Sequence, residues 1–354
     1  MKIAVDAMGS DRAPVPDVAG AVQAAKELGV EIILLGPQDI VRAELAKHDH
    51  AGAQITIVHA PEVVAMEEHT IAVKSKKGSS MVIGMQMVRR GEADAFVSAG
   101  NSGAVMAAAL FHLGRLKGIL RPAISALYPT VRGRCVVLDV GANTDCKPEY
   151  LVQFALMGRV YAERALGITQ PRIGILSNGE EEGKGNILVR ETYELLKRSG
   201  HNFVGNVEGK DVPLGLADVV VTDGFTGNVL VKLSEGLIMA IAKMIKRTLA
   251  SGWRARLALV LMLPGVILLL PGIALLWPSV KRLITSLDPD EAGGAPLLGV
   301  RGPVIIGHGR SNAVAIRNAI RAAVRAVESD IVGAIRDGLA RTAAPESAPT
   351  AESN

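Results

Sequence analysis

The chain has 354 residues, of which 49% are hydrophobic, 21% are charged and 3% are aromatic, and its formal net charge is +4. This length allows a large core in one or two domains, and 38 glycines with 17 prolines are too few for a collagen-like or low-complexity chain. The mild charge and the scarcity of aromatic residues argue against a nucleic-acid partner, and two cysteines are too few for a disulfide framework.

The N-terminal segment has none of the features of a secretory signal. Residues 1–10 carry a carboxylate at Asp6 and contain no apolar core of seven residues. Because the chain also has only two cysteines, we expect a protein of the reducing cytoplasm.

The first three-quarters of the chain alternate short apolar runs with amphipathic stretches. The apolar runs, most of them rich in Val and Ile, predict strands at Lys2–Asp6, Glu31–Leu35, Gln54–His59, Ala95–Ser98, Cys135–Val140, Arg172–Leu176, Phe203–Asn206 and Asp218–Thr222. The amphipathic stretches predict helices at Pro16–Leu28, Ser79–Arg89, Gly103–Leu113, Pro148–Leu166 and Asn186–Arg198. This alternation predicts an α/β fold with a doubly wound, mostly parallel sheet.

After Thr226 the pattern changes. A long helix is predicted over about residues 227–249, and it is followed by 21 residues without a charge, Leu257–Trp277. Residues 288–296, rich in Asp, Gly and Pro, predict a loop.

The C-terminal part returns to the α/β pattern. It predicts one more strand at Pro303–Ile306 and one more helix at Ser311–Val327. Residues 342–354 consist largely of Ala, Pro, Ser and Glu, a composition that predicts a disordered tail.

Four Gly- and Asn-containing turns follow predicted strands and lead towards helices, at residues 98–103, 139–145, 177–186 and 222–228. In an open α/β sheet the ligand crevice lies at the carboxyl ends of strands, and glycine-rich turns at helix starts expose backbone amides to anions. We therefore expect four such turns at one sheet edge to form a phosphate or oxyanion site. The alternative is that Gly and Asn only connect strand to helix, since turn chemistry explains any one of these segments.

Familiar catalytic motifs are absent from these turns. Gly179 and Gly183 are too close together for a P-loop, and Gly185 follows Lys184 where a P-loop has Ser or Thr. No dinucleotide fingerprint follows the first strand, and no Gly-x-Ser-x-Gly elbow occurs. No grouping of His, Asp or Glu has metal-ligand spacing, so we expect neither a metal nor another cofactor.

Cys146 and His308 can each be interpreted in two ways. Cys146 is followed by Lys147, so it is either an activated thiolate or an ordinary small residue in a turn. His308 lies between a predicted strand and a predicted helix beside Arg310, where it either contacts an anion or only faces solvent.

Several long motifs occur in one order from residue 1 to about 335. They are Val5–Asp11 with Pro14, Ser98–Gly103, Leu138–Asn143, Lys147–Glu149, Gly205–Glu208 and Asp218–Val229. Together these motifs resemble the bacterial phosphate acyltransferase family (PlsX). The chain departs from the family pattern at Ser10 and Ser102, where Gly and Thr are expected, in the acidic run 180–182, and in the length of the apolar stretch.

The resemblance implies transfer of an acyl group from acyl-acyl-carrier-protein to inorganic phosphate. The product would be an acyl phosphate, the donor for a membrane glycerol-3-phosphate acyltransferase in phospholipid synthesis. The resemblance also implies a homodimer with a fold akin to phosphotransacetylases and isocitrate-type dehydrogenases. Two other functions stay open: a phosphotransacylase that uses coenzyme A, and a non-catalytic membrane scaffold.

The reaction needs no nucleophile from the protein, because phosphate itself attacks the thioester. The protein has to orient phosphate and stabilise the oxyanion. The resemblance implies that Lys184 and Asn228 are catalytic residues. Phosphate and oxyanion binding is expected from the turns, at Ser98, Gly100, Asn101, Ser102, Gly103, Asn143, Gly185, Asn186, Thr226 and Gly227. Asp6, Asp139 and Asp223, at strand ends, are expected mainly to organise the adjacent loops.

The apolar stretch Leu257–Trp277 is long enough to span a bilayer, but Pro264 and Pro271 would break a straight helix. Both of its flanks are basic, which favours both ends on the cytoplasmic side. We therefore expect a helical hairpin over residues 251–290 that protrudes from one α/β domain formed by residues 1–250 and 297–340.

The tip of this hairpin is expected to enter one leaflet of the inner face of the cell membrane. The expected membrane contacts are Trp253, Leu261, Ile267 and Trp277. Burial of the stretch in the core or in a dimer interface is the alternative. Basic patches at Arg89–Arg90, Lys243/Lys246/Arg247 and Arg254/Arg256 either dock the acidic carrier protein or are solvated helix faces.

Overall fold

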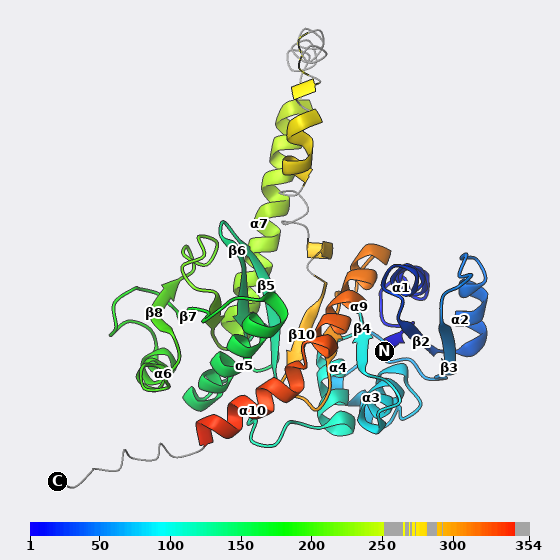
Figure 1. The fold of residues 1–354 in the computed structure, drawn as a ribbon, viewed down its shortest axis with the longest axis horizontal. Coiled ribbons are helices and arrows are strands. Elements are labelled where there is room, and N and C mark those ends of the chain that lie inside the picture. The colour runs from blue at the N-terminus through cyan, green and yellow to red at the C-terminus, as the bar shows by residue number, and fades with distance from the viewer. Residues whose placement is uncertain are drawn as a thin grey trace, which may run out of the picture.

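The sheet of this protein has eleven strands in the order β3-β2-β1-β4-β11-β10-β5-β6-β9-β7-β8 (Figure 1). The structure is a computed structural model that describes residues 1–250, 265, 269, 271–272, 274–281, 289–291 and 293–343. The strands are β1 (Lys2–Asp6), β2 (Glu31–Gly36), β3 (Ile55–His59), β4 (Ala95–Ser98), β5 (Ala123–Thr130), β6 (Gly133–Leu138), β7 (Ile173–Ser177), β8 (Phe203–Glu208), β9 (Val219–Val221), β10 (Ala295–Leu298) and β11 (Val304–Ile306).

Helices cover both faces of the sheet. They are α1 (Val15–Leu28), α2 (Gln38–Leu45), η1 (Thr70–Lys74), α3 (Ser80–Arg90), α4 (Ser102–Ala108), η2 (Ala109–Leu113), α5 (Pro148–Leu166), α6 (Ile187–Lys197), α7 (Gly224–Ala250), η3 (Pro289–Glu291), α9 (Ala313–Glu328) and α10 (Ile331–Ala343). In the first half, α1 and α9 pack on one face and α3 and α4 on the other; in the second half, α5 and α10 cover one face. This confirms the predicted doubly wound, mostly parallel α/β fold.

The two halves of the sheet run in opposite directions. β3, β2, β1, β4 and β11 are parallel, and so are β6, β9, β7 and β8. Between them β10 is antiparallel to both β11 and β5, and β5 is antiparallel to β6. The turn after β4 therefore does not share a sheet edge with the turns after β6, β7 and β9, and the expectation of four turns at one edge is wrong.

Local sequence explains where several helices begin and end. Pro16 and Pro148 lie in the first turns of α1 and α5, where the missing amide costs nothing. Gly29 and Gly167 end these two helices with φ of 64° and 70°, a conformation that only glycine adopts without strain. The central strands β1, β2 and β4 are largely apolar because helices cover both faces of the sheet there; in β1, for example, Ala4 faces the core opposite to that of its neighbours.

Some elements were not predicted. The sequence pattern did not predict α2, β5 or α10, and it predicted a loop at residues 288–296, whose last two residues begin β10. β10 is short and contains Pro296, which cannot donate to the sheet, so its pattern resembles that of a loop. α10 continues to Ala343, so residues 342–343 are helical, and the remaining predicted tail, 344–354, lies outside the described residues.

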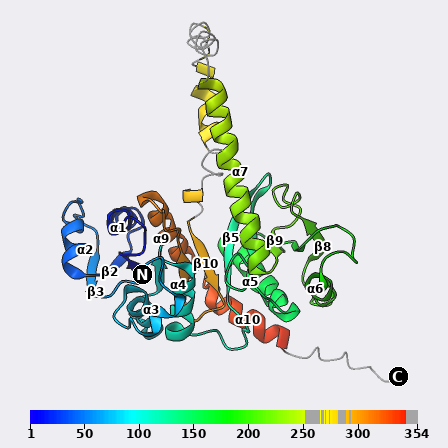
Figure 2. The same ribbon diagram turned by 180° about the vertical axis from the view of Figure 1, so that it is seen from behind.

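α7 projects well beyond the body of the molecule in both views (Figures 1 and 2). Residues 274–281 are helical and are drawn next to its distal half. Most of the predicted hairpin lies outside the described residues, including Trp253, Leu261 and Ile267. Within the described parts of the chain, no helix combines the length and apolarity needed to cross a bilayer.

Candidate active site

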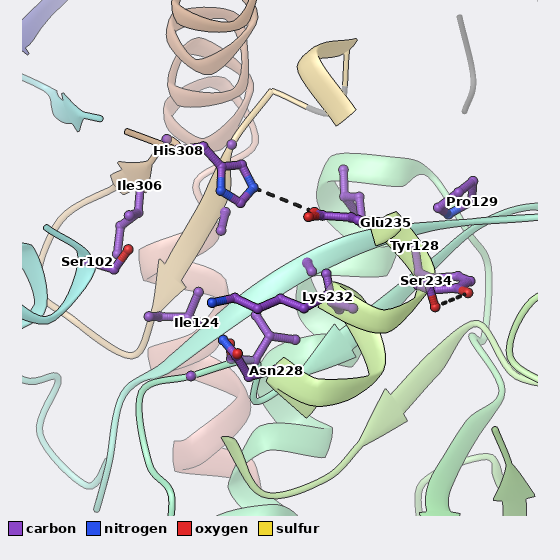
Figure 3. A pocket seen from close by; sticks show the side chains of 18 of the residues that line it. Ser102, Ile124, Tyr128, Pro129, Asn228, Lys232, Ser234, Glu235, Ile306 and His308 are labelled. Carbon is purple, nitrogen blue, oxygen red and sulfur yellow. Dashed lines mark hydrogen bonds and ion pairs between the residues drawn. The ribbon is translucent and has the colours of Figure 1, made fainter. Parts of the chain in front are cut away.

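A cavity of about 290 Å³ lies between the two halves of the sheet (Figure 3). Its floor includes Ile124 and Ala126 of β5 and Ala295 of β10. One wall is the first half of α7, and the other is formed by the segments that follow β4 and β11. The antiparallel strands β5 and β10 thus bring together residues from two sheet halves that run in opposite directions.

Three of the predicted site residues line this cavity: Ser102, Asn228 and His308. Gly141, from the turn after β6, lines it as well. The other predicted residues are not among its lining residues: Lys184, Gly185, Asn186, Ser98, Gly100, Asn101, Gly103, Asn143, Thr226, Gly227, Asp6 and Asp223.

Lys184 lies in the exposed loop between β7 and α6. This loop is held by local bonds: the Lys184 amide donates to the Glu181 carbonyl, and the Asn186 side chain accepts from the Val189 amide at 2.9 Å as the N-cap of α6. The structure therefore does not bring Lys184 together with Asn228 in the cavity. The catalytic role of Lys184 stays a prediction.

The turn after β6 is built around the buried carboxylate of Asp139. This carboxylate accepts the backbone amides of Ile124, Gly141, Ala142 and Asn143 at 2.6–3.2 Å, and the Asn143 side chain adds a further bond at 2.9 Å. Burial raises the pKa of Asp139, whereas these hydrogen bonds lower it. The amides of this turn are thus occupied by the protein's own carboxylate.

Amides of the turn after β4 and of the turn after β9 are occupied in the same way. The Gly100 amide donates to Ser98 Oγ, and the amides of Thr226 and Gly227 donate to the side chain and the carbonyl of Asp223. The expectation that the amides of Gly100, Thr226 and Gly227 are free for an anion is therefore wrong.

Asn101 and Ser102 mark the start of α4. The Asn101 side chain accepts from the Ala104 amide at 3.1 Å, as an N-cap residue does. In the described residues the amides of Ser102 and Gly103 have no partner. Ser102 therefore offers both its hydroxyl and the α4 start to the cavity.

Asp6 lies beneath the turn after β4. Ser98 Oγ donates to its carboxylate at 2.7 Å and the Met8 amide at 3.1 Å, and burial raises its pKa. These are contacts within the loops at the ends of β1 and β4.

Asn228 is held at the floor of the cavity by the close approach of α7 to the turn after β6. Its Nδ2 donates to the Val140 carbonyl at 2.9 Å. A Cβ at Gly227 would lie 1.9 Å from the Asp139 carbonyl oxygen, so only glycine allows this approach. An amide nitrogen has two hydrogens, and no described residue accepts the second hydrogen of Asn228.

Lys232 is a cavity residue that the sequence motifs did not predict. It lies one helical turn after Asn228 on α7, and residues four apart share a helix face. Figure 3 shows its amine extending across the cavity between His308 and Asn228. Its Nζ makes no hydrogen bond or ion pair with any described residue. The spacing of four from Asn228 in a predicted helix was the signal that could have identified it.

Glu235 lies close to two basic side chains at the rim of the cavity. Its carboxylate oxygens lie 3.7 Å from Nε2 of His308 and 3.6 Å from Nη2 of Arg310 (Figure 3). The side chains of His308 and Arg310 are both exposed, whereas Glu235 is mostly covered. His308 is thus positioned at the cavity entrance beside a carboxylate.

The surroundings of Cys146 argue against an activated thiolate. Burial, together with the nearby charge on Asp139, raises the pKa of Cys146 to about 12. Its thiol donates to the Asn143 carbonyl at 3.5 Å. Cys146 is therefore a protonated turn residue at neutral pH, and Cys135 is buried in the core.

The described residues contain one cluster of carboxylates close enough to hold a metal ion: Glu180, Glu208 and Asp211. Lys210 already forms ion pairs with Glu180 and Glu208 there, and these bonds raise the pKa of its amine. This cluster does not line the cavity.

Residues 1–333 match a family whose description is "Fatty acid synthesis protein". The chain is 50% identical over 340 residues to a phosphate acyltransferase from Pelotomaculum thermopropionicum, covering 96% of this chain and 95% of that protein. It is 48% identical over 340 residues to a phosphate acyltransferase from Thermus thermophilus, covering 96% and 98%. The chain belongs to the phosphate acyltransferase family. This confirms the resemblance predicted from the motifs.

Solved structures show that the phosphate acyltransferase fold is shared more widely. A phosphotransacetylase from Streptococcus pyogenes superposes with a TM-score of 0.60 at 19% identity, covering 93% of this chain and 94% of that one. A phosphotransacetylase from Staphylococcus aureus gives a TM-score of 0.56 at 16% identity, with coverage of 92% and 94%. The predicted likeness to phosphotransacetylases is thus confirmed for the fold.

Proposed function

We propose that this phosphate acyltransferase transfers a fatty acyl group from acyl-acyl-carrier-protein to inorganic phosphate in the cavity between the sheet halves. The product is an acyl phosphate, the donor for a membrane glycerol-3-phosphate acyltransferase. The family supports the acyl transfer. The presence of Asn228 and Lys232 in one cavity supports the site.

The unpaired amine of Lys232 is the observation on which the proposed site rests. A cation without an acceptor, in a cavity floored by the apolar side chains of β5 and β10, provides a place for an anion. Asn228 adds a neutral N–H donor one turn earlier on the same helix face. Ser102, from the other sheet half, lines the same cavity.

The chemistry follows from this placement. An oxygen of phosphate attacks the thioester carbonyl carbon, the carbonyl becomes a tetrahedral oxyanion, and its collapse breaks the C–S bond and releases the carrier thiolate. Lys232 and Asn228 orient the attacking phosphate, and Ser102 is a donor for the oxyanion. His308, beside Glu235 at the entrance, is placed to give the departing thiolate its proton. The catalytic role of Lys184 is implied by the family motif, and a separate Lys184→Ala variant tests it.

The test is a trapping assay. Acylated carrier protein, phosphate and enzyme are incubated with hydroxylamine, which converts acyl phosphate to a hydroxamate. We expect hydroxamate that depends on phosphate, and more of it from acyl-carrier-protein than from acyl-coenzyme A. Absence of phosphate-dependent hydroxamate contradicts the function, and a preference for acyl-coenzyme A contradicts the donor.

We also propose that the enzyme associates peripherally with the inner face of the membrane through the segment after α7. The described residues of that segment support this: Leu275 is 82% exposed and Trp277 is 56% exposed. In a liposome flotation assay, a variant with Leu261→Asp and Ile267→Asp should lose binding. If flotation is unchanged and the variant instead loses the proposed homodimer, the segment is a subunit contact.

The carrier protein is proposed to dock on the basic face of α7. Arg90 is paired with Glu92 and Arg89 bonds to the His112 carbonyl, so these two arginines are already engaged. Lys243, Lys246 and Arg247 are exposed and unpaired within the described residues. Binding of the acidic carrier protein should weaken as salt rises and in a Lys243→Glu, Lys246→Glu variant. Salt-independent binding contradicts this docking site.

A further inference from the structure

A long segment, residues 60–79, connects β3 to α3. Its only helix is the short η1, and connections of more than about 12–15 residues with so little regular structure are uncommon in compact domains and usually functional. Val64 and Val73 are buried in the core that α3 and α4 form with the sheet. The β3–α3 segment is therefore a fixed part of the fold, and its contacts show what it supports.

The β3–α3 segment contacts the part of the cavity wall that follows β4. Asn101 Nδ2 donates to the carbonyls of Met66 and Glu68, at 2.8 and 3.4 Å. Asn101 Oδ1 accepts the Ala104 amide at 3.1 Å and so caps α4. The residue after Asn101 is Ser102, which lines the cavity. One amide side chain thus joins the segment to the helix start that presents Ser102.

The same segment contacts the part of the wall that follows β11. The terminal methyl of Met66 lies so close to Gly309 that a Cβ on this glycine would be 2.5 Å from it. His308, which also lines the cavity, is the residue before Gly309. The Gly309 carbonyl accepts the Asp11 amide at 2.7 Å as well. The position of the turn that carries His308 is therefore set by two separate loops.

Lys76 ties the β3–α3 segment to itself. Its Nζ donates to the Val63 carbonyl at 2.7 Å and to the Glu68 carboxylate at 2.6 Å. The same carboxylate oxygen accepts the Ala65 amide at 2.7 Å. These bonds fix the stretch whose carbonyls Asn101 binds.

We propose that Asn101 is a positioning residue, which locks the β3–α3 segment onto the wall that carries Ser102 and His308 and so holds these two donors next to the thioester. This inference rests on the proposed function, in which Ser102 stabilises the oxyanion and His308 supplies the proton. In that function phosphate is bound at the opposite wall, by Lys232 and Asn228 of α7. Loosening the segment should therefore slow the chemical step and leave phosphate binding as it is.

The first test is the variant Asn101→Ser. Serine is an equally good N-cap residue and adds no charge, so the variant loses mainly the bonds to the segment. Because a displacement of about 1 Å can cost about a hundredfold in rate, kcat should fall at least about tenfold, while KM for phosphate should stay within about twofold. Asn202→Ser is the matched control. Asn202 Nδ2 also donates to a carbonyl, that of Gln170 at 2.9 Å, but this residue precedes β8 at the far edge of the sheet, so its loss should change neither kcat nor KM.

A second variant, Lys76→Met, loosens the segment without changing Asn101. It should also lower kcat at an unchanged KM for phosphate, and Lys76→Arg should recover part of the loss because it keeps a cationic donor. Hydrogen exchange of the enzyme without substrates should become faster in both Asn101→Ser and Lys76→Met, at residues 98–104 and 305–311 as well as at 60–79.

Three results would overturn the positioning role. They are an unchanged kcat in folded Asn101→Ser, a loss confined to KM for phosphate, which would make Asn101 a phosphate ligand, and faster exchange confined to residues 60–79. If the wild type makes no acyl phosphate, the proposed function fails. The exchange measurement then decides by itself whether Asn101 and the segment hold the turns of Ser102 and His308.

Discussion

Removal of the Lys232 amine tests the site most specifically. Lys232→Ala deletes a cation that has no partner among the described residues, so folding should not suffer. Hydrogen bonds to charged groups contribute about 1.5–3 kcal/mol, and the exposure of Lys232 favours the lower end of that range. Since about 1.4 kcal/mol corresponds to a factor of ten, kcat/KM for phosphate should fall about tenfold or more.

The assay is the initial rate of hydroxamate formation at varied phosphate, with saturating acyl-carrier-protein. Lys232→Arg should recover part of the loss because it keeps the charge. Lys117→Ala, which removes an exposed lysine from the loop before β5, is the matched control and should behave as the wild type. Unchanged kinetics for phosphate in a folded Lys232→Ala protein would refute the reasoning.

Three further predictions concern residues outside the cavity lining. The family motif predicts that Lys184→Ala lowers turnover at least tenfold at an unchanged melting temperature, and normal turnover would remove Lys184 from the mechanism. Cys146→Ala should keep near-wild-type activity. Iodoacetamide should react slowly with Cys146 at pH 8, since the pKa of its thiol is raised to about 12. A large loss of activity in Cys146→Ala would indicate instead that the thiol is catalytic. Burial raises the pKa of Asp17 to about 7 from 3.8, so the folded state holds a proton that the unfolded chain releases. The stability that this proton contributes is fully present below about pH 3.8 and is lost as the pH rises through about 7. Thermal melts at pH 5 and pH 8 should show a smaller decline for Asp17→Asn than for the wild type, and identical pH profiles would contradict this.

The fold could be predicted largely because its strands are buried on both faces. β1 and β4 were predicted with the bounds that the structure gives them, as was α5, where Pro148 and Gly167 mark both ends. Strand direction could not be predicted from such runs. Three successive antiparallel pairings, β11 with β10, β10 with β5 and β5 with β6, reverse the second half of the sheet, and the pairing of β10 with the distant β5 cannot be read from local sequence.

The site could be predicted only in part. Asn228, Ser102 and His308 were identified and do line one cavity. Asp139 and Asp223 organise the adjacent loops, as predicted, but the sequence did not show that they do so by accepting the turn amides expected to bind an anion, because the residue that bonds an amide depends on loop geometry. Turn chemistry does not indicate Lys232, because this residue lies inside the helix that follows Asn228 and not in a turn.

A crystal of the enzyme soaked in phosphate tests the central claim most directly. We predict one phosphate in the cavity between the sheet halves, within hydrogen-bond distance of Lys232 Nζ and Asn228 Nδ2. Phosphate bound instead at the loop of Lys184 and Asn186, with only solvent next to Lys232, would contradict the account.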